Sequence, residues 1–170
     1  MICPYSLRPG QVKKQKKMNN NSLEKGLAVA YRLLSHRART EKQIREALDR
    51  RQFTQTIIEQ VVAELKRKGY VNDRQYTRDY IDFRLQGKPY GPLWLRASLL
   101  RRGVAREIVE EELHAVISAE KERKLAQLFF EQIQSTLDSR EKAFRRLLSR
   151  GFSYAAAQKV LKEVDFSSEK

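Results

Sequence analysis

Apolar residues recur at helical spacing along most of this chain, in three similar copies about 50 residues apart, and polar residues fill the positions between them. The matched core positions are Ile44, Leu48, Phe53, Ile57 and Val62, then Leu95, Leu99, Val104, Ile108 and Leu113, then Ala143, Leu147, Phe152, Ala156 and Leu161. The helix before each set joins the register through Ala30 and Leu34, Ile81 and Leu85, and Phe129 and Ile133. A period of this length is typical of tandem repeats that bury their apolar faces against one another.

The pattern predicts nine helices, near residues 23–37, 41–51, 55–68, 73–87, 92–102, 106–117, 119–135, 139–150 and 154–164. No segment alternates apolar and polar residues with a period of two, so no sheet is expected. Each repeat reads as a long helix, a short helix, a tight turn and a third helix, and the last two resemble a helix-turn-helix. The expected fold is all-α, with three tandem three-helix repeats forming an extended, curved helical array.

Local signals mark where these helices begin and end. Capping boxes, in which a side-chain oxygen accepts a bond from an unpaired backbone N–H, are expected at Thr40 with Gln43, Asn72 with Gln75, and Asp138 with Glu141. Helix starts are also expected at Thr54, at Ser153 and at Pro92, which follows Gly91. Helix stops that favour positive φ are expected at Gly69, Gly103 and Gly151.

The segment that precedes the repeats differs from them in composition. Residues 1–21 are rich in Lys and Asn and lack a helical apolar period, which is typical of a flexible basic arm. Its lysines can contact phosphate, although a solvated tail is the simpler interpretation. The expected domains are the arm at 1–21 and three-helix repeats at 22–70, 71–118 and 119–170.

Charge narrows the class of partner. The formal net charge is +14 and the sequence pI is about 10.1, so an anionic partner is expected: nucleic acid, an acidic protein surface or a membrane face. No apolar run approaches the roughly 18 residues of a membrane span, so a membrane is the weakest of these. The single cysteine, Cys3, excludes a disulfide within the chain. We expect a cytoplasmic monomer.

The centre of the chain resembles the hallmark segment of a known family. The residues that carry the resemblance are Gly69-Tyr70, Asp73, Tyr76, Tyr80-Ile81, Arg84, Tyr90-Gly91-Pro92, Leu95-Arg96, Leu99 and Arg102-Gly103-Val104. They are similar to the RecX family, the bacterial regulators of the recombinase RecA, which are built from tandem three-helix repeats. Asn72 departs from the acidic residue usual there, but Asn caps a helix about as well as Asp. The resemblance implies binding to RecA filaments on DNA and restraint of their ATPase and strand exchange.

Basic side chains recur near the ends of the second helices and in further clusters. Cations stabilise a helix C-terminus by about 0.3–1 kcal/mol, which alone could account for several of them. Stacked repeats would also line them along one side of the array, which suits a long anionic target. The candidate contacts with RecA filaments, or with DNA directly and nonspecifically, are Arg50, Arg51, Lys66, Arg67, Lys68, Arg96, Arg101, Arg102, Arg106, Arg145, Arg146 and Arg150.

The aromatic residues read mainly as core. Tyr76, Tyr80 and Phe83 follow one helical face, which favours burial. Tyr70 is expected to pack against the next repeat. Trp94 lies between two leucines, and the three cannot share one face. Its helix is therefore either sandwiched between repeats or leaves Trp94 partly exposed to a partner.

The sequence contains no recognisable set of catalytic residues. His36 and His114 stand alone, and the run Glu110, Glu111 and Glu112 cannot converge on one atom, because consecutive helical residues point about 100° apart. No P-loop, HExxH motif or nucleophile elbow occurs, so no enzyme, metal or cofactor is expected. The alternative to a RecA regulator is a nonspecific DNA-binding protein that uses its helix-turn-helix-like repeats. A structural adaptor is the third hypothesis. The third helices lack a consistent set of base-reading side chains.

Overall fold

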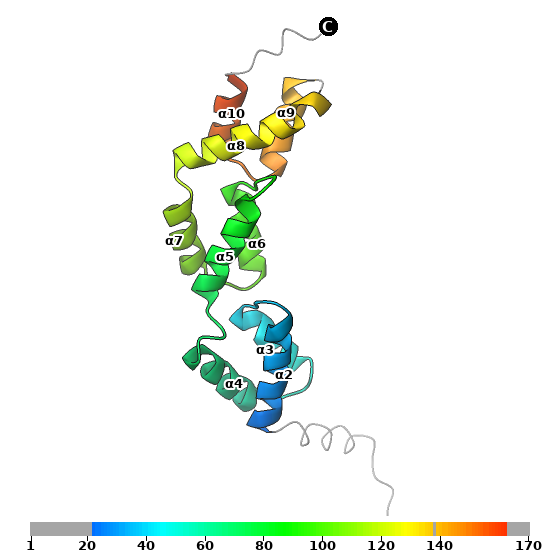
Figure 1. The fold of residues 1–170 in the computed structure, drawn as a ribbon, viewed down its shortest axis with the longest axis vertical. Coiled ribbons are helices and arrows are strands. Elements are labelled where there is room, and N and C mark those ends of the chain that lie inside the picture. The colour runs from blue at the N-terminus through cyan, green and yellow to red at the C-terminus, as the bar shows by residue number, and fades with distance from the viewer. Residues whose placement is uncertain (1–21, 138, 163–170) are drawn as a thin grey trace, which may run out of the picture. The chain divides into compact units, whose positions relative to one another are not determined.

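The protein is described by a computed structural model that covers residues 22–137 and 139–162, and its regular elements in these ranges are helices (Figure 1). The predicted basic arm, residues 1–21, lies outside the described residues, as do Asp138 and residues 163–170. The chain divides into two compact units that meet between Asn72 and Asp73. Each unit is described by itself.

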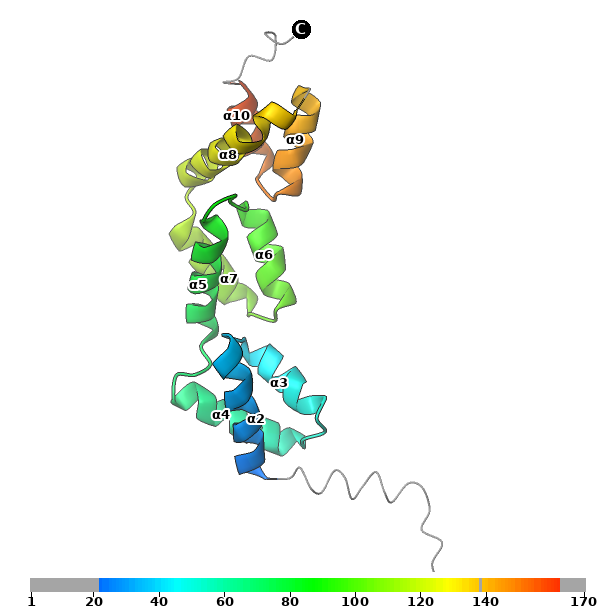
Figure 2. The ribbon, with the colours of Figure 1, turned by 45° about the vertical axis from the view of Figure 1, so that its right-hand side comes forward.

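The first unit is one three-helix repeat. It contains α2 (Leu23–His36), α3 (Glu41–Asp49) and α4 (Gln55–Arg67), which pack against one another (Figures 1 and 2). Its core is formed by apolar residues from all three helices and from the segments after α3 and α4: Ala30, Ile44, Leu48, Phe53, Ile57, Ile58, Val61, Val62, Leu65 and Val71.

The second unit contains two repeats in sequence. The first of them is built from α5 (Asp73–Leu85), α6 (Pro92–Arg101) and α7 (Arg106–Val116) around Ile81, Leu95, Leu99, Val104, Val109 and Leu113. The next contains α8 (Ala119–Ile133), a 3₁₀ turn (Gln134–Thr136), α9 (Arg140–Ser149) and α10 (Tyr154–Lys162). Helix α8 lies across both α9 and α10 (Figure 2), and together they enclose Phe129, Phe130, Leu147, Phe152, Val160 and Leu161.

The predicted repeat register is confirmed. Leu48, Leu99 and Leu147 are each fully buried, and each lies in the core of its own repeat. The nine expected helices all form, with bounds within two residues of the prediction. The extended, curved arrangement of the three repeats and their exact boundaries stay predictions.

Side-chain hydroxyls cap the starts of α3, α8, α9 and α10. The Thr40 hydroxyl accepts a hydrogen bond from the N–H of Gln43, as expected. The box predicted at Asp138 lies outside the described residues; α9 begins at Arg140, after Ser139, whose hydroxyl accepts from the N–H of Lys142. The Ser153 hydroxyl accepts a hydrogen bond from the N–H of Ala156, and α10 begins at the next residue, Tyr154, as predicted.

The short turn between the second and third helices has the same backbone conformation in each repeat. Gly103 and Gly151 have φ values of 82° and 89° there, as the helix-stop signals predict. Gln52 occupies the equivalent place in the first repeat, with a φ of 61°. A side chain in this left-handed region costs about 1–2 kcal/mol, so geometry is maintained here against the residue's own preference.

The structure decides two of the aromatic predictions, that for the face of Tyr76, Tyr80 and Phe83 and that for Trp94, whereas the packing of Tyr70 against the next repeat, which lies in the other unit, stays a prediction. Phe83 is 65% exposed, so its assignment to the core was wrong, whereas Tyr76 and Tyr80 do pack on the core of their repeat. Tyr70 is also exposed and contacts the ring of Tyr31 in its own unit, edge-on at 5.3 Å. Trp94 is half-buried and stacks on Tyr90 at a centroid distance of 3.9 Å.

Candidate partner-binding surface

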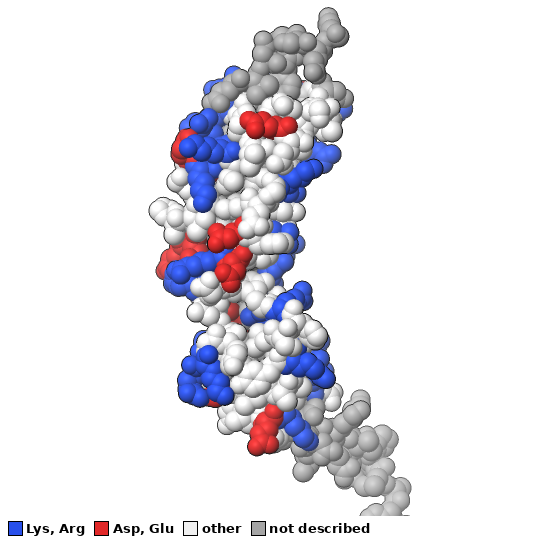
Figure 3. All heavy atoms as spheres, viewed as in Figure 1, with Lys and Arg blue, Asp and Glu red and all other residues white. Residues whose placement is uncertain are grey.

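Two of the predicted basic residues stand in equivalent positions and point into solvent. Arg50 follows α3 and Arg101 ends α6, and both side chains are exposed. Within residues 22–137 and 139–162, neither side chain has a hydrogen-bond or ion-pair partner. Figure 3 shows basic side chains along the margins of each unit, with fewer acidic ones among them. These two arginines are therefore available to an anionic partner.

The next position in each repeat is also an arginine, but it has a structural partner. Arg51 donates a hydrogen bond to the main-chain oxygen of Ala47 at 2.8 Å, and Arg102 donates to that of Ser98 at 2.9 Å. Both therefore cap the last turn of their own helix, which is the simpler reading of cations at a helix C-terminus. Arg102 also lies over the ring of Tyr80, 4.5 Å from its centroid.

Arg150, the third member of this set, reaches into the preceding repeat instead. Its guanidinium donates to the main-chain oxygens of Pro89, at 3.1 Å, and Lys88, at 2.6 Å. The same group lies 3.6 Å from the centroid of the Tyr90 ring. Arg150 is only partly exposed, so this predicted contact residue serves the junction between the second and third repeats.

Backbone atoms complete that junction. The N–H of Gly91 donates to the carbonyl of Arg150, and the N–H of Leu93 donates to that of Gly151, both at 3.0 Å. A methyl group on Gly91 would overlap the Gly151 carbonyl, and one on Gly151 would overlap Trp94. Trp94 is therefore held between the two repeats while its ring stays partly exposed, so both features of the earlier alternatives are present.

Arg84 lies in an aromatic cage beside this junction. Its guanidinium is 5.3–5.5 Å from the ring centroids of Tyr80, Phe83, Tyr90 and Trp94. Its Nε is buried and has no hydrogen-bond partner among the described residues. Cation–π attraction to the surrounding rings compensates part of the free-energy cost of burying this nitrogen without a hydrogen bond.

The cluster Lys66, Arg67 and Lys68 is paired within the first unit. Lys66 donates to Glu41 at 2.9 Å, and Arg67 donates two bonds to Glu64 at 2.8 and 2.9 Å. Hydrogen bonds from Arg67 and Lys68 lower the pKa of the Glu64 carboxyl to about 2. These cations are exposed, so they can still contact a partner, but the carboxylates reduce their net charge.

The three glutamates of the acidic run on α7 form ion pairs with two different helices, α5 and α6. Glu110 accepts two hydrogen bonds from Arg96 of α6, at 2.7 and 2.8 Å. That bond lowers the pKa of Glu110, and it makes Arg96 a structural residue. Glu110 therefore faces α6, whereas Glu111 and Glu112 both pair with Arg74 of α5, so the three carboxylates do not meet at one atom, as expected from helical geometry.

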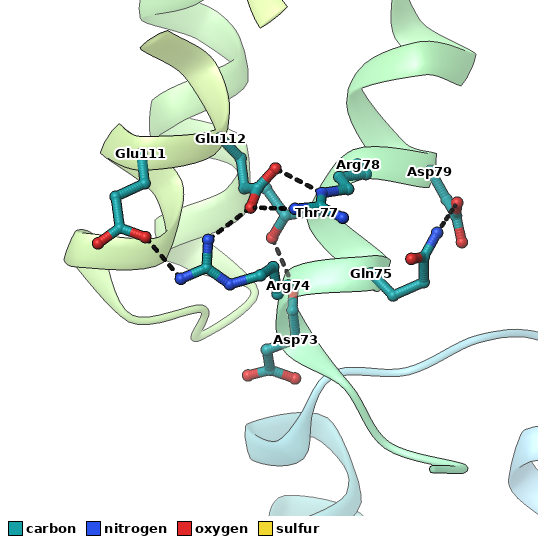
Figure 4. Close-up of polar contacts among 8 residues, drawn as sticks. All are labelled: Asp73, Arg74, Gln75, Thr77, Arg78, Asp79, Glu111 and Glu112. Carbon is teal, nitrogen blue, oxygen red and sulfur yellow. Dashed lines mark hydrogen bonds and ion pairs between the residues drawn. The ribbon is translucent and has the colours of Figure 1, made fainter. Parts of the chain in front are cut away.

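The ion pairs on the other side of α7 were missed by sequence reasoning (Figure 4). Glu112 is 3% exposed and accepts from Arg74 at 2.7 Å and from Arg78 at 2.7 and 3.1 Å. Arg74 also donates to Glu111 at 2.5 Å. Arg78 and Arg74 lower the pKa of Glu112 despite its burial. The i, i+4 spacing of the two arginines was the available signal, but their partner is remote in sequence.

The remaining predicted contacts lie on exposed surface. Arg106 opens α7, and Arg145 and Arg146 lie on α9, with Arg145 within 3.4 Å of the main-chain oxygen of Glu141. The structure thus keeps Arg50, Arg101, Arg106, Arg145 and Arg146 as exposed candidates. It assigns packing or capping roles to Arg51, Arg96, Arg102 and Arg150.

Other kinds of site find little support in the described ranges. No group of three or more His, Cys, Asp or Glu side chains there could hold a metal ion. His36 and His114 are exposed on separate helices. No helix in the described part of the chain is long and apolar enough to cross a membrane.

Comparisons with known proteins agree on one family. A family model described as RecX, first three-helix domain, matches residues 27–65, and one described as RecX, second three-helix domain, matches residues 72–113. Regulatory protein RecX of Streptococcus agalactiae serotype III (strain NEM316) is 26% identical over 177 residues, covering 99% of this chain and 68% of that protein. The Leuconostoc citreum (strain KM20) protein of the same name is 30% identical over 156 residues, covering 88% of this chain and 58% of its own length. The chain thus spans between about half and two thirds of these relatives.

Solved structures share the fold. The crystal structure of RecX from Lactobacillus salivarius superposes with a TM-score of 0.69 at 24% identity, over 83% of this chain and 95% of that one. A crystal structure described as regulatory protein RecX gives 0.70 at 19% identity, over 96% and 82%.

Proposed function

The chain belongs to the RecX family, and from that premise we propose that it regulates RecA by binding the filament that RecA forms on DNA. The expected effect is suppression of RecA ATP hydrolysis and strand exchange, without turnover of a substrate by this protein. The observation that carries the proposal is the match of two consecutive three-helix domains over residues 27–113.

The exposed arginines supply a physical basis for binding. Arg50 and Arg101 occupy equivalent positions in the first and second repeats, where the third repeat has Ser149, and their side chains have no partner among the described residues. Cations that recur along a repeat protein suit an anionic target that itself repeats. Contacts to neighbouring protomers would resist the opening and closing that accompany ATP turnover, and would block the growing end of the filament.

The central test is RecA ATP hydrolysis on single-stranded DNA, measured with increasing amounts of this protein. We expect suppression at substoichiometric amounts. The double variant Arg50→Glu, Arg101→Glu should need at least about tenfold more protein for the same suppression, because each reversal turns an attraction into a repulsion. Its helical content should match that of the wild type.

The matched control reverses the same amount of charge elsewhere. Lys13→Glu with Lys14→Glu changes two cations in the N-terminal arm, whose attraction should be nonspecific and screened by salt. This variant should suppress ATP hydrolysis nearly as well as the wild type. Equal suppression by the Arg50 and Arg101 variant would contradict the assigned surface.

A second measurement separates the alternative function. Binding to naked single- and double-stranded oligonucleotides is followed by fluorescence anisotropy over a range of salt concentrations. Tight binding to naked duplex, together with unchanged RecA activity, would favour a nonspecific DNA-binding protein. The affinity would then fall steeply with salt.

A further inference from the structure

The third repeat departs from the second at the groove between its second and third helices. In the second repeat, Arg96 on α6 and Glu110 on α7 form a two-bond ion pair across this place. The repeat register puts Phe144 and Gln158 at the equivalent positions of α9 and α10. An ion pair is thus replaced by an aromatic ring and an amide.

In the first repeat the equivalent residues are Arg45 and Glu59, which are also charged. Arg45 donates to Glu41 at 2.8 Å and Glu59 accepts from Gln55 at 3.2 Å, so each is paired within its own helix. Charged side chains therefore occupy these two positions in the first and second repeats, whereas the third repeat has an aromatic ring and an amide there.

The groove between α9 and α10 has a volume of about 500 Å³. Phe144, Tyr154 and Leu161 form its apolar floor. The rings of Phe144 and Tyr154 meet edge-on, 5.1 Å apart and at 82°. Tyr154 is 61% exposed, so much of this residue is open to solvent.

Positive charge borders this floor. Arg140 and Arg145 line the groove, with Glu141 as the one acidic side chain there. Neither arginine has a carboxylate partner in residues 22–137 and 139–162. Arg145 instead approaches the main-chain oxygen of Glu141 at 3.4 Å. The described rim therefore carries two positive charges and one negative charge, without a two-bond pair such as that of Arg96 and Glu110.

Shape distinguishes between anionic partners. A nucleic-acid base stacks on the open face of a flat ring. Here the two rings form a corner, which fits a branched or aromatic side chain better than the face of a base. The volume falls within the range of about 300–1,000 Å³ that is usual for binding pockets with an apolar lining and a few polar groups.

We propose that this groove binds an acidic peptide segment of a partner protein. A large apolar side chain of the peptide contacts Phe144 and Tyr154, and flanking carboxylates pair with Arg140 and Arg145. Arginine clusters beside an apolar anchor site are a recurring way to bind acidic motifs. The proposal goes beyond binding to the RecA filament, because it requires neither DNA nor the arginines at positions 50 and 101.

The test uses the full-length protein and a short fluorescein-labelled peptide in which Glu and Asp flank a central Phe-Leu pair. Binding is measured by fluorescence anisotropy. Tyr154→Ser and Arg140→Glu should each weaken binding by about tenfold, which corresponds to about 1.4 kcal/mol. Peptides with Gln in place of the acidic residues, or with Ser in place of Phe-Leu, should bind the wild-type protein at least about tenfold more weakly than the original peptide does.

Matched controls lie on α8, outside the groove. Leu128→Ser removes a side chain that is 43% exposed, and Lys121→Glu reverses an exposed charge in the same repeat. Both should bind the peptide as the wild type does. Thermal melts confirm that each variant folds, because Tyr154 and Arg140 are both exposed and should contribute little to stability.

Besides one result from self-association, four results of the binding assay would overturn the proposal. They are unchanged binding by Tyr154→Ser, equal binding of the Gln peptide, displacement by a single-stranded oligonucleotide at lower concentration than by unlabelled peptide, and binding that occurs only after residues 163–170 are deleted. The third result would assign the groove to nucleic acid, and the fourth to this chain's own segment. Concentration-dependent self-association lost in Tyr154→Ser would assign it to a second copy. Failure of the RecA assay would leave the peptide result unaffected, so the two proposals fail separately.

Discussion

The guanidinium of Arg150 stacks on the ring of Tyr90 at 3.6 Å from its centroid, and this contact ties the third repeat to the second. The equivalent residues, Arg51 and Arg102, bond to the last turn of their own helices instead. One repeated arginine thus has two structural roles: Arg150 bonds to the preceding repeat of its own unit, whereas Arg51 and Arg102 bond to their own helices. Arg150 therefore belongs to the fold more than to the surface for a partner.

The close approach at Gly151 should make this turn unusually sensitive to substitution. Gly151→Ala introduces both an unfavourable φ and an overlap with Trp94. We expect a loss of at least about 3 kcal/mol in the free energy of unfolding, measured by urea denaturation.

Gly69→Ala is the matched control, because Gly69 has a φ of 75° but nothing within 4 Å of an added Cβ. It should lose only about 1–2 kcal/mol. Equal losses in the two variants would mean that the contact with Trp94 contributes nothing beyond the backbone strain.

The buried carboxylate on α7 should contribute more than its exposed neighbour. Glu112→Gln leaves Arg74 and Arg78 without their shared charge partner, and should lower the free energy of unfolding by about 1–3 kcal/mol at neutral pH. Glu111→Gln, at a side chain that is 58% exposed, should lower it by less than about 0.5 kcal/mol. Chemical denaturation of both variants measures the difference, and similar values would place the stabilisation elsewhere.

Acid should remove the contribution of the same carboxylate. The pKa of Glu112 is lower in the folded protein than its ordinary value of 4.5, so its stabilisation is present above that value and is lost as pH falls below it. The difference in Tm between wild type and Glu112→Gln should therefore be largest near about pH 7 and should shrink towards about pH 3. A difference that stays constant with pH would show that packing, not charge, explains the effect.

The core register predicts a contrast between adjacent leucines. Leu99 is fully buried, and Leu99→Ala should cost about 2–5 kcal/mol. Leu100 is 37% exposed, and Leu100→Ala should cost about 1 kcal/mol or less. Thermal and urea unfolding of the pair would test the alignment of the repeats, and a larger loss for Leu100→Ala would reject it.

The sequence was sufficient for features that depend on local chemistry. Helical periodicity located the buried leucines, and a hydroxyl three residues before its bonding partner located the Thr40 cap. Glycine at positions 103 and 151 marked turns of positive φ. Gln52 also has a positive φ, but without that signal.

Features that depend on neighbouring helices were not predicted. Phe83 follows the same helical face as Tyr80, yet the core of this repeat ends before it reaches Phe83, which stays exposed. Whether a surface arginine is free or paired depends on carboxylates that are distant in sequence, as with Arg78 and Glu112. For this reason, the sequence could identify the basic residues that are candidates for partner binding, but the structure was needed to show which of them have no carboxylate partner.

The bonds from Gly91 and Leu93 to the turn after α9 have a consequence for amide hydrogen exchange. The first N–H groups of a helix have no partner within it, and here two such groups at the start of α6 bond to carbonyls of the third repeat. Their exchange rates therefore report whether the third repeat is folded, although the amides themselves belong to the second. Opening of α8, α9 and α10 would expose these two amides to solvent while the interior of α6 stayed protected.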